Sequence, residues 1–303
     1  MKKIITLVLL VAIFLVTIFY NQEIVGFIVD NFLTAKKTNS VLNNNEYASN
    51  RDYQFVQITD DFTPHNKQDI LNIYYTVINS GMTDFVFYCP EEYKECINDV
   101  NYISNNQSLL SNINNFVQVY NSFSHIETEF DSLGKVQMTI HHTYTDEQIT
   151  EIDAVVDELI TSLLTPEMTD EEKIKTIHDY IINNTKYDKD RSDNKIKKYH
   201  SDIAYGALLE HYAICGGYAD SMKIFLDRLG IENFKIASEN HIWNFVKLNG
   251  DWYHLDLTWD DPVTDTGEDI LEYDYFLITT DELLEKENDQ HIYDKSVYIE
   301  AAA

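Results

Sequence analysis

The sequence has little glycine, proline and positive charge, and each shortage excludes a class of protein. Only 9 glycines and 4 prolines occur in 303 residues, which excludes collagen-like and Pro/Gly-rich low-complexity architectures. The chain has 22 Lys and Arg but 51 Asp and Glu, which gives a formal net charge of −29. Because basic side chains neutralise nucleic-acid phosphates, we expect no nucleic-acid partner. By contrast, 44% hydrophobic residues supply a folded core, and the length allows roughly two domains.

A long apolar run lies at the N-terminus. Lys2 and Lys3 precede an apolar stretch from Ile4 to Tyr20. The stretch is at the lower edge of the roughly 17–25 residues that span a bilayer, and no small-residue cleavage site follows it. We predict an uncleaved signal anchor over residues 1–22, with a cleaved signal peptide and secretion as the alternative. The lysines stay inside, so the body of the chain is expected outside the cytoplasm, held to the cell membrane by a single pass.

The three cysteines differ in their expected state. Cys89 and Cys96 are close enough in sequence for a local disulfide, with two reduced thiols as the alternative. Cys215 has no obvious partner. An odd count in an exported chain leaves one free thiol or an intermolecular bridge.

Hydrophobic periodicity divides the rest of the chain into a stalk and two domains. Residues 23–50 are weakly periodic and are interpreted as a stalk. Residues 51–145 predict a small α+β domain, and residues 146–298 a second one. The first is expected to contain a strand over 53–58, a helix from Thr63-Pro64 to Gly81, a strand over 85–88 and a hairpin of 126–130 with 136–142.

Two predicted helices open the second domain. The first has apolar residues at helical spacing over 149–163, and the second over 174–181 after a capping box of Thr169 and Glu172. His178 lies on the apolar face of the second helix, so we interpret it as a core histidine. No internal repeat is visible.

Cys215 is predicted to lie in the first turn of a helix over about 216–229. Apolar residues recur at helical spacing after it, and Gly230 suits the end. Free backbone N–H groups at a helix start favour an anion, the reactive form of a thiol. Gly216 and Gly217 are expected to leave room for a substrate beside the sulfur. A buried structural cysteine is the alternative.

A hairpin at Asn249-Gly250 predicts which residues lie opposite each other. Asn-Gly indicates a two-residue turn, so Trp243 pairs with Asp256. His241 and Asp256 then become diagonal neighbours on one face, with Cα atoms about 7–8 Å apart. Cys215 would be the nucleophile, His241 the base and later the acid, and Asp256 the group that orients the imidazole. Taken singly, the histidine and the aspartate would be ordinary hairpin residues.

Three motifs in this order resemble the core of the transglutaminase-like superfamily. They are Cys215-Gly-Gly-Tyr-Ala, His241-Ile-Trp-Asn, and Trp252-Tyr-His-Leu-Asp256-Leu-Thr-Trp-Asp-Asp-Pro262. The resemblance covers about 170–262 and implies a papain-like α+β core, in which a helix carrying the nucleophile packs on an antiparallel sheet. It assigns the same three roles to Cys215, His241 and Asp256.

The resemblance also suggests accessory residues. The family stabilises the oxyanion with a donor near the cysteine, for which Tyr205 and the Cys215 backbone N–H are candidates. His211 stands where members often have glycine, so it would crowd the cleft or act as a second polar group. Trp243 is a further candidate for the cleft wall, together with Trp252 and Trp259.

No cofactor or metal site is predicted. His141 and His142 alternate on a strand, and His125 and His65 lack ligand-spaced neighbours. The acidic run after the core lacks the spacing of a calcium loop and is interpreted as solvated. It comprises Asp260, Asp261, Asp265, Glu268 and Asp269.

The combined expectation is an extracytoplasmic enzyme that attacks an amide or peptide bond through a thioester. The acyl group would pass to an amine or to water, and the substrate would be a protein or cell-wall peptide. The membrane is the other expected partner, through the N-terminal helix. The alternative is a non-catalytic cell-surface binding module on a transglutaminase-like fold.

Overall fold

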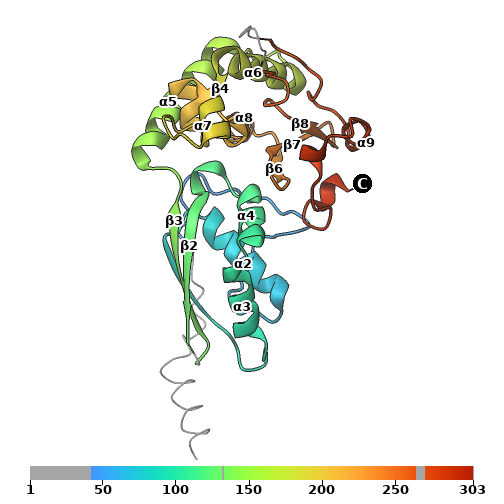
Figure 1. Cartoon of the computed structure of the whole chain (residues 1–303). Coiled ribbons are helices and arrows are strands. Elements are labelled where there is room, and N and C mark those ends of the chain that lie inside the picture. Colours follow the sequence, from blue (N-terminus) through green and yellow to red (C-terminus); the bar gives the residue numbers. More distant parts are fainter. Residues whose placement is uncertain (1–41, 132, 264–269, 303) are drawn as a thin grey trace, which may run out of the picture.

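The computed structural model describes residues 42–131, 133–263 and 270–302. The predicted anchor over 1–22 and most of the predicted stalk lie outside these ranges. Within them, no helix is both long and apolar enough to cross a membrane. Figure 1 shows helices α2 to α4 with strands β2 and β3 in the lower part, and α5 to α8 with β6 to β8 in the upper part.

The lower part combines three helices with an antiparallel sheet in the order β1-β3-β2. The helices are α2 (Lys67–Asn79), α3 (Cys96–Asn105) and α4 (Gln107–Phe116), and the strands are β1 (Asp84–Tyr88), β2 (Phe123–Phe130) and β3 (Lys135–His142). The predicted strand over 85–88 and the predicted hairpin are present. A disulfide joins Cys89 to Cys96, whereas Cys215 is free.

The start of this part differs from the prediction. Residues 53–58 form no strand. Side chains of α2 replace a strand partner there, because Asn72 Oδ1 accepts from the Gln57 N–H at 3.0 Å and Thr76 Oγ1 from the Thr59 N–H at 3.0 Å. The helix begins after Asn66, whose side chain accepts from the Asp69 N–H, so the predicted start at Thr63-Pro64 was too early. Helices α3 and α4 were not predicted.

The upper part places helices around a second antiparallel sheet, ordered β6-β7-β8. Its strands are β6 (Asn233–Ala237), β7 (Ile242–Leu248) and β8 (Asp251–Leu255), with a short parallel pair of β4 (Lys186–Tyr187) and β5 (Tyr212–Ala213). Its helices are α5 (Asp146–Leu163), α6 (Asp170–Asn184), α7 (Lys189–Asn194), α8 (Cys215–Arg228) and α9 (Thr280–Glu285). The predicted α+β class and the three predicted helices of this region are confirmed, as is the capping box of Thr169 and Glu172.

Shorter helical turns connect these elements. They are η2 (Val119–Asn121), the π-helical η3 (Gly206–Glu210), η4 (Asp289–His291) and η5 (Ile299–Ala301). The last two lie in the C-terminal segment, and η4 ends with the buried His291.

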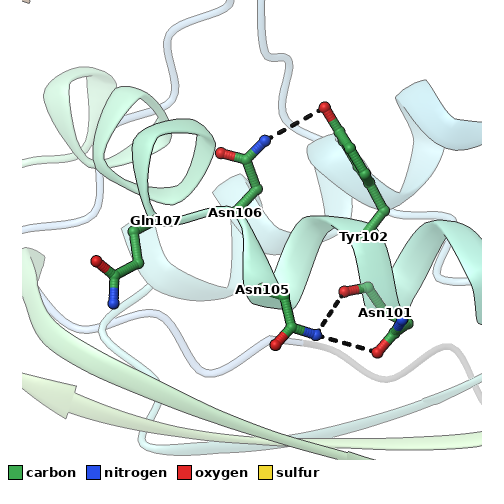
Figure 2. Close-up of a pocket in the computed structure, with 5 residues that line it drawn as sticks. All are labelled: Asn101, Tyr102, Asn105, Asn106 and Gln107. Carbon is green, nitrogen blue, oxygen red and sulfur yellow. Dashed lines mark hydrogen bonds between the residues drawn. The ribbon is translucent and has the colours of Figure 1, made fainter.

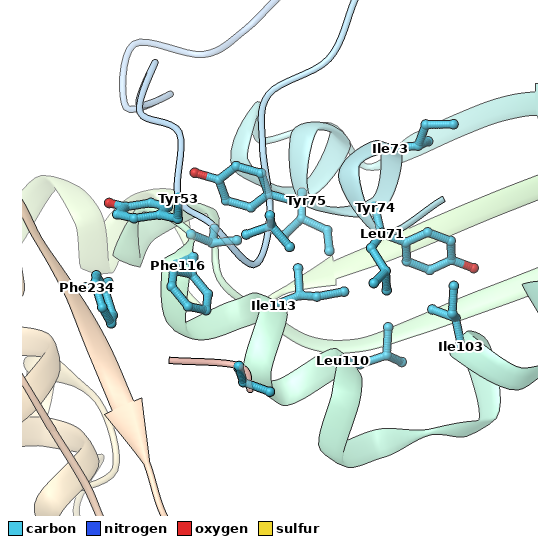
Figure 3. Close-up of a cluster of buried hydrophobic side chains, with 14 of the residues drawn as sticks. Tyr53, Leu71, Ile73, Tyr74, Tyr75, Ile103, Leu110, Ile113, Phe116 and Phe234 are labelled. Carbon is cyan, nitrogen blue, oxygen red and sulfur yellow. The ribbon is translucent and has the colours of Figure 1, made fainter. Parts of the chain in front are cut away.

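One of two hydrophobic core clusters joins the two parts, while the other lies mainly among the helices of the upper part. Phe234 of β6 packs on Phe116 of α4, with ring centroids 4.8 Å apart, and on Tyr53 at 5.3 Å (Figure 3). The Tyr53 hydroxyl also donates to the Asn233 carbonyl at 3.1 Å. The lower part therefore covers one face of the β6-β7-β8 sheet. The predicted division into domains at residue 145 stays a prediction.

Helix α8 covers the other face of this sheet and is held there by polar contacts. Lys235 of β6 donates to Asp220 at 2.5 Å, and Asn244 of β7 donates to the Ala219 carbonyl at 2.9 Å. Tyr144 donates to the second Asp220 oxygen at 2.6 Å. Because buried polar groups are costly unless they are satisfied, these bonds favour one position of α8 against the strands.

Candidate active site

Cys215 is the first residue of α8 and is half-buried. The Ile214 carbonyl accepts from the N–H groups of Gly217 and Tyr218, at 2.9 and 3.2 Å, and so closes the first turn. The N–H groups of Cys215 and Gly216 lie at the helix start, where they have no partner within the helix. Cys215 therefore lies at the positive end of the helix dipole, in the first turn where the sequence predicted it.

The two glycines after Cys215 serve a different purpose from the one expected. A Cβ on Gly216 would lie 2.6 Å from the Asp202 carbonyl oxygen, and one on Gly217 would lie 2.5 Å from that of Ser201. The same segment bonds to the helix start through the Ile214 N–H and the Ser201 oxygen, at 2.8 Å. The missing side chains allow this backbone to approach, rather than leaving room for a substrate.

The β7–β8 hairpin has the predicted register. Asn249 and Gly250 have φ angles of 54° and 98°, as a two-residue turn of the Asn-Gly type requires. Leu248 pairs with Asp251, and the ladder continues to Asn244 with Leu255. His241 lies just before β7 and Asp256 just after β8, so both are at the same end of the hairpin.

His241 and Asp256 form a buried hydrogen-bonded pair. The His241 Nε2 donates to Asp256 Oδ2 at 2.5 Å, and the residues are 6% and 1% exposed. Since Nε2 is occupied, Nδ1 is the ring nitrogen left for another partner. The Cys215 side chain is close enough to His241 to contribute to the raised pKa of its ring. The structure thus joins His241 to Asp256 and places Cys215 near the same imidazole.

The pair stabilises a charged imidazole. Burial alone would lower the pKa of His241, but the Asp256 carboxylate and the Cys215 side chain outweigh it and raise the pKa to about 10. Burial likewise opposes the Asp256 charge, yet His241 and His291 hold the pKa of this carboxyl below its usual range. At neutral pH the arrangement therefore favours imidazolium beside an ionised carboxylate.

His291 is a member of the site that the sequence analysis missed. Its Nε2 donates to Asp256 Oδ2 at 2.8 Å, while the N–H groups of Thr258 and Trp259 donate to Oδ1 at 3.0 and 3.3 Å. With His241, the carboxylate accepts four hydrogen bonds, which fixes its orientation. His291 lies on η4 (Asp289–His291), and no motif or periodicity in the sequence pointed to it.

Trp243 supports the imidazole from within the core. Its ring stacks on His241 with centroids 5.6 Å apart and planes 16° apart, and it is only 1% exposed. The indole donates to His254 Nδ1 at 3.0 Å. Burial, and then the charge of His291, lower the pKa of His254 to about 3, so this ring is neutral and its Nε2 faces Thr280 at 3.2 Å. Trp243 thus packs behind the site instead of forming a cleft wall.

Tyr205 and His211 make their contacts elsewhere. The Tyr205 hydroxyl donates to Glu151 of α5 at 2.7 Å, so it gives no support to an oxyanion role. His211 Nδ1 lies 3.0 Å from the Asn184 carbonyl oxygen, and the residue borders a hollow of about 450 Å³ formed with residues 183–186. Neither side chain joins the group of Cys215, which leaves the backbone N–H of Cys215 as the predicted donor at this position.

A larger surface hollow of about 630 Å³ lies where α3 meets α4 (Figure 2). Its lining consists of amide side chains and one phenol, from Asn101, Tyr102, Asn105, Asn106 and Gln107. It offers neither a nucleophile nor an ionised group, so it does not compete with the Cys215 site for acyl chemistry.

A second buried histidine–carboxylate pair lies apart from the thiol. His178 Nε2 donates to Asp260 Oδ2 at 3.1 Å, and both residues are 0% exposed. His178 is therefore the core histidine that was predicted. Asp260 and Asp261, however, are buried, so the prediction of a solvated acidic loop was wrong for these two. Asp265, Glu268 and Asp269 lie outside the described residues.

Comparison with known proteins agrees with the motif resemblance. Residues 157–257, which include Cys215, His241 and Asp256, match the family described as the transglutaminase-like superfamily. No curated protein matches the chain. Two solved structures are similar in part, each at 15% sequence identity: a TGase, with a TM-score of 0.34, and a proposed cysteine protease from Cytophaga hutchinsonii, with a TM-score of 0.29.

These similarities are partial on both sides. They cover 45% and 48% of this chain, and 44% and 65% of the two solved chains. The chain therefore spans less than two thirds of either structure. The family match nevertheless confirms the predicted resemblance over residues 157–257, the segment that contains the three site residues.

Proposed function

We propose that this transglutaminase-like chain is a cysteine enzyme that transfers acyl groups from an amide or peptide bond. The observation that supports it best is the position of the His241 ring, which bonds to Asp256 through Nε2 and interacts with Cys215. A nucleophile, a base and an orienting acid within hydrogen-bond reach are the requirements of covalent acyl transfer.

The reaction proceeds in two steps. The Cys215 thiolate attacks the carbonyl carbon, the C–N bond breaks, and the protonated His241 gives its proton to the departing amine, which leaves a thioester on the sulfur. Water or a second amine then attacks the thioester. His241 takes the proton of the attacking group, the C–S bond breaks, and the thiolate is restored.

Charge in these steps is stabilised by groups already in position. Asp256 keeps the imidazole oriented and stabilises the imidazolium, and its own charge is held by four hydrogen bonds. The backbone N–H groups of Cys215 and Gly216 at the start of α8 donate to the oxyanion that develops on the carbonyl oxygen.

The proposed place of action is outside the cytoplasm, with the chain held at the membrane by residues 1–22. Lys2, Lys3 and the apolar run that follows them support an anchor with this orientation. The Cys89–Cys96 disulfide supports the same compartment, because such bonds persist in oxidising environments. Surface proteins or cell-wall peptides are the substrates that such a position offers.

Trapping of the thioester tests the proposal. The full chain is incubated with surface-protein and cell-wall peptide extracts, quenched in acid and digested, and the Cys215 peptide is analysed by mass spectrometry. We expect a hydroxylamine-sensitive acyl adduct, which is absent in Cys215→Ala.

Two additions identify the acceptor. A labelled primary amine reports crosslinking, and ¹⁸O-water reports hydrolysis. If the folded chain yields no adduct and neither label enters a product, the enzyme proposal fails and the non-catalytic binding module is the better account.

A further inference from the structure

Three side chains capable of binding a metal ion lie together on the exposed face of the β1-β3-β2 sheet. The Glu127 Oε1 is 3.5 Å from His141 Nε2 and 3.9 Å from His125 Nε2. One ligand atom from each residue lies within 4.8 Å of the other two, and all three residues are exposed. None of them belongs to the Cys215 site, which is on other elements.

The strand pairing produces this group. His125 of β2 lies directly opposite His141 of β3, and Glu127 follows His125 by two residues, on the same face of the strand. The pairing register shifts between Phe123 and His125. The irregularity lies beyond the group, so the His125–His141 pair belongs to the regular ladder that continues to Phe130 and Val136.

A hydrogen bond orients one of the rings. The Ser124 hydroxyl donates to the His141 carbonyl at 3.0 Å, and its oxygen is 3.5 Å from His125 Nδ1. Because the hydroxyl proton is used by the carbonyl, this oxygen is an acceptor for an Nδ1–H. That tautomer leaves the Nε2 lone pair of His125 directed to Glu127, and such contacts commonly fix the imidazole ligands of metals.

We propose that His125, Glu127 and His141 bind a divalent transition-metal ion of the zinc class. Two imidazole nitrogens and one carboxylate form a set of three zinc ligands that leaves the fourth position open. With metal–ligand distances of about 2.0–2.2 Å, tetrahedral ligands are separated by roughly 3.4 Å. The observed separations are 3.5 and 3.9 Å. Because the two imidazole rings are stacked, with centroids 3.9 Å and planes 11° apart, these exposed side chains must rotate until both Nε2 atoms point at the ion. Calcium and magnesium prefer more oxygen ligands than the group offers.

The competing explanation is a surface ion pair. Glu127 would then interact with the two histidines alone, at a solvent-exposed site where such pairs contribute little to stability. This explanation predicts no specific affinity for zinc, so a binding experiment separates the two.

The test uses the full chain without a polyhistidine tag, in a Cys215→Ala background that removes the free thiol. After dialysis against a chelator, Zn²⁺ is titrated by calorimetry. We expect one equivalent whose affinity falls by about tenfold or more in His125→Ala and in His141→Ala. His65→Ala removes an exposed histidine outside the group and should bind zinc like the parent.

A thermal measurement supplies the second readout. Zinc should raise the Tm of the parent and of His65→Ala, but not of His141→Ala, because a ligand of the folded state stabilises it. Near-UV circular dichroism checks that all variants fold alike. The proposal is overturned if the parent binds no zinc, or if His125→Ala and His141→Ala bind it with the affinity of the parent. Since Cys215 is absent, neither result bears on the acyl-transfer proposal.

Discussion

The chain contains two buried histidine–aspartate pairs with almost the same local chemistry. In one, His241 donates to Asp256 at 2.5 Å, and in the other, His178 donates to Asp260 at 3.1 Å. The pairs differ in what lies near the imidazole besides the aspartate. The half-buried thiol of Cys215 lies near His241 and contributes to its raised pKa, whereas the second ring nitrogen of His178 is 3.0 Å from a further carboxylate, that of Asp179.

Burial raises the pKa of both carboxyls, but the net pKa shifts of the two groups are opposite. Burial raises the pKa of Asp260, and its hydrogen bonds only partly offset this. At Asp256 the charges and hydrogen bonds of His241 and His291 outweigh burial and lower the pKa. The proposal therefore assigns catalysis to the pair beside Cys215 and not to the pair of His178 and Asp260. The Cys215 site combines a strongly held charge on the carboxylate with a half-buried thiol at a helix start.

Asp256→Asn should lower turnover more than the other variants of these two pairs. The amide keeps the shape but cannot stabilise the imidazolium, so turnover should fall roughly 10²- to 10⁴-fold. The raised pKa of His241, about 10, predicts that activity is lost as pH rises through that value. In the variant this alkaline limb should move down toward the ordinary imidazole value of about 6.5. A pH–rate profile measures both, and an unmoved limb would contradict the assigned role.

His291→Phe should have an intermediate effect. The variant keeps an aromatic ring but removes one donor to Asp256, for an expected loss of about tenfold in turnover, or roughly 1.4 kcal/mol. His291 is a positioning residue here, so a second readout is needed. Because the pKa of folded Asp256 is lowered, its charge contributes stability above about pH 4 that is lost as the pH falls.

The acid side of the stability curve gives that readout. Without His291 the pKa of Asp256 should rise, so the variant should be less stable than the parent at pH 7, and the difference should shrink below about pH 4. Urea unfolding at several pH values measures this. A difference that does not change with pH would assign His291 a packing role only.

Asp260→Asn is the matched control and should have the smallest effect on turnover. It makes the same change in the other pair, which does not contact the thiol. We expect turnover within a few-fold of the parent and an unchanged alkaline limb. The free energy of unfolding should fall by about 1–3 kcal/mol, because the buried bond to His178 is weakened. A loss of turnover as large as that of Asp256→Asn would remove the distinction between the pairs.

The sequence predicted the parts of the site that local rules determine. The turn at Asn249-Gly250 determines the register that brings His241 to Asp256, and helical spacing after Cys215 determines where α8 begins. Local rules could not predict the contact of His291 with Asp256, because tertiary packing alone brings this histidine there from a short turn in the C-terminal segment.

Other misses have the same origin. The apolar residues at 53–58 suit a strand, but side chains of α2 take the place of a partner strand. Gly216 and Gly217 are explained by a backbone segment that packs against them from elsewhere in the chain. Asp260 belongs to an acidic run in the sequence, yet it is buried because His178 of α6 lies beside it. Each required knowledge of a neighbour distant in sequence.

The most direct test of the central claim is the rate at which iodoacetamide alkylates Cys215 near neutral pH. Cys89 and Cys96 are joined, so Cys215 is the only free thiol among the three cysteines. We predict that the parent and Asp260→Asn react at similar rates. The rate for His241→Ala should be at most about one tenth of the parent's, like that of a small-molecule thiol. Equal rates for the parent and a folded His241→Ala would contradict the claim that this imidazole activates the sulfur.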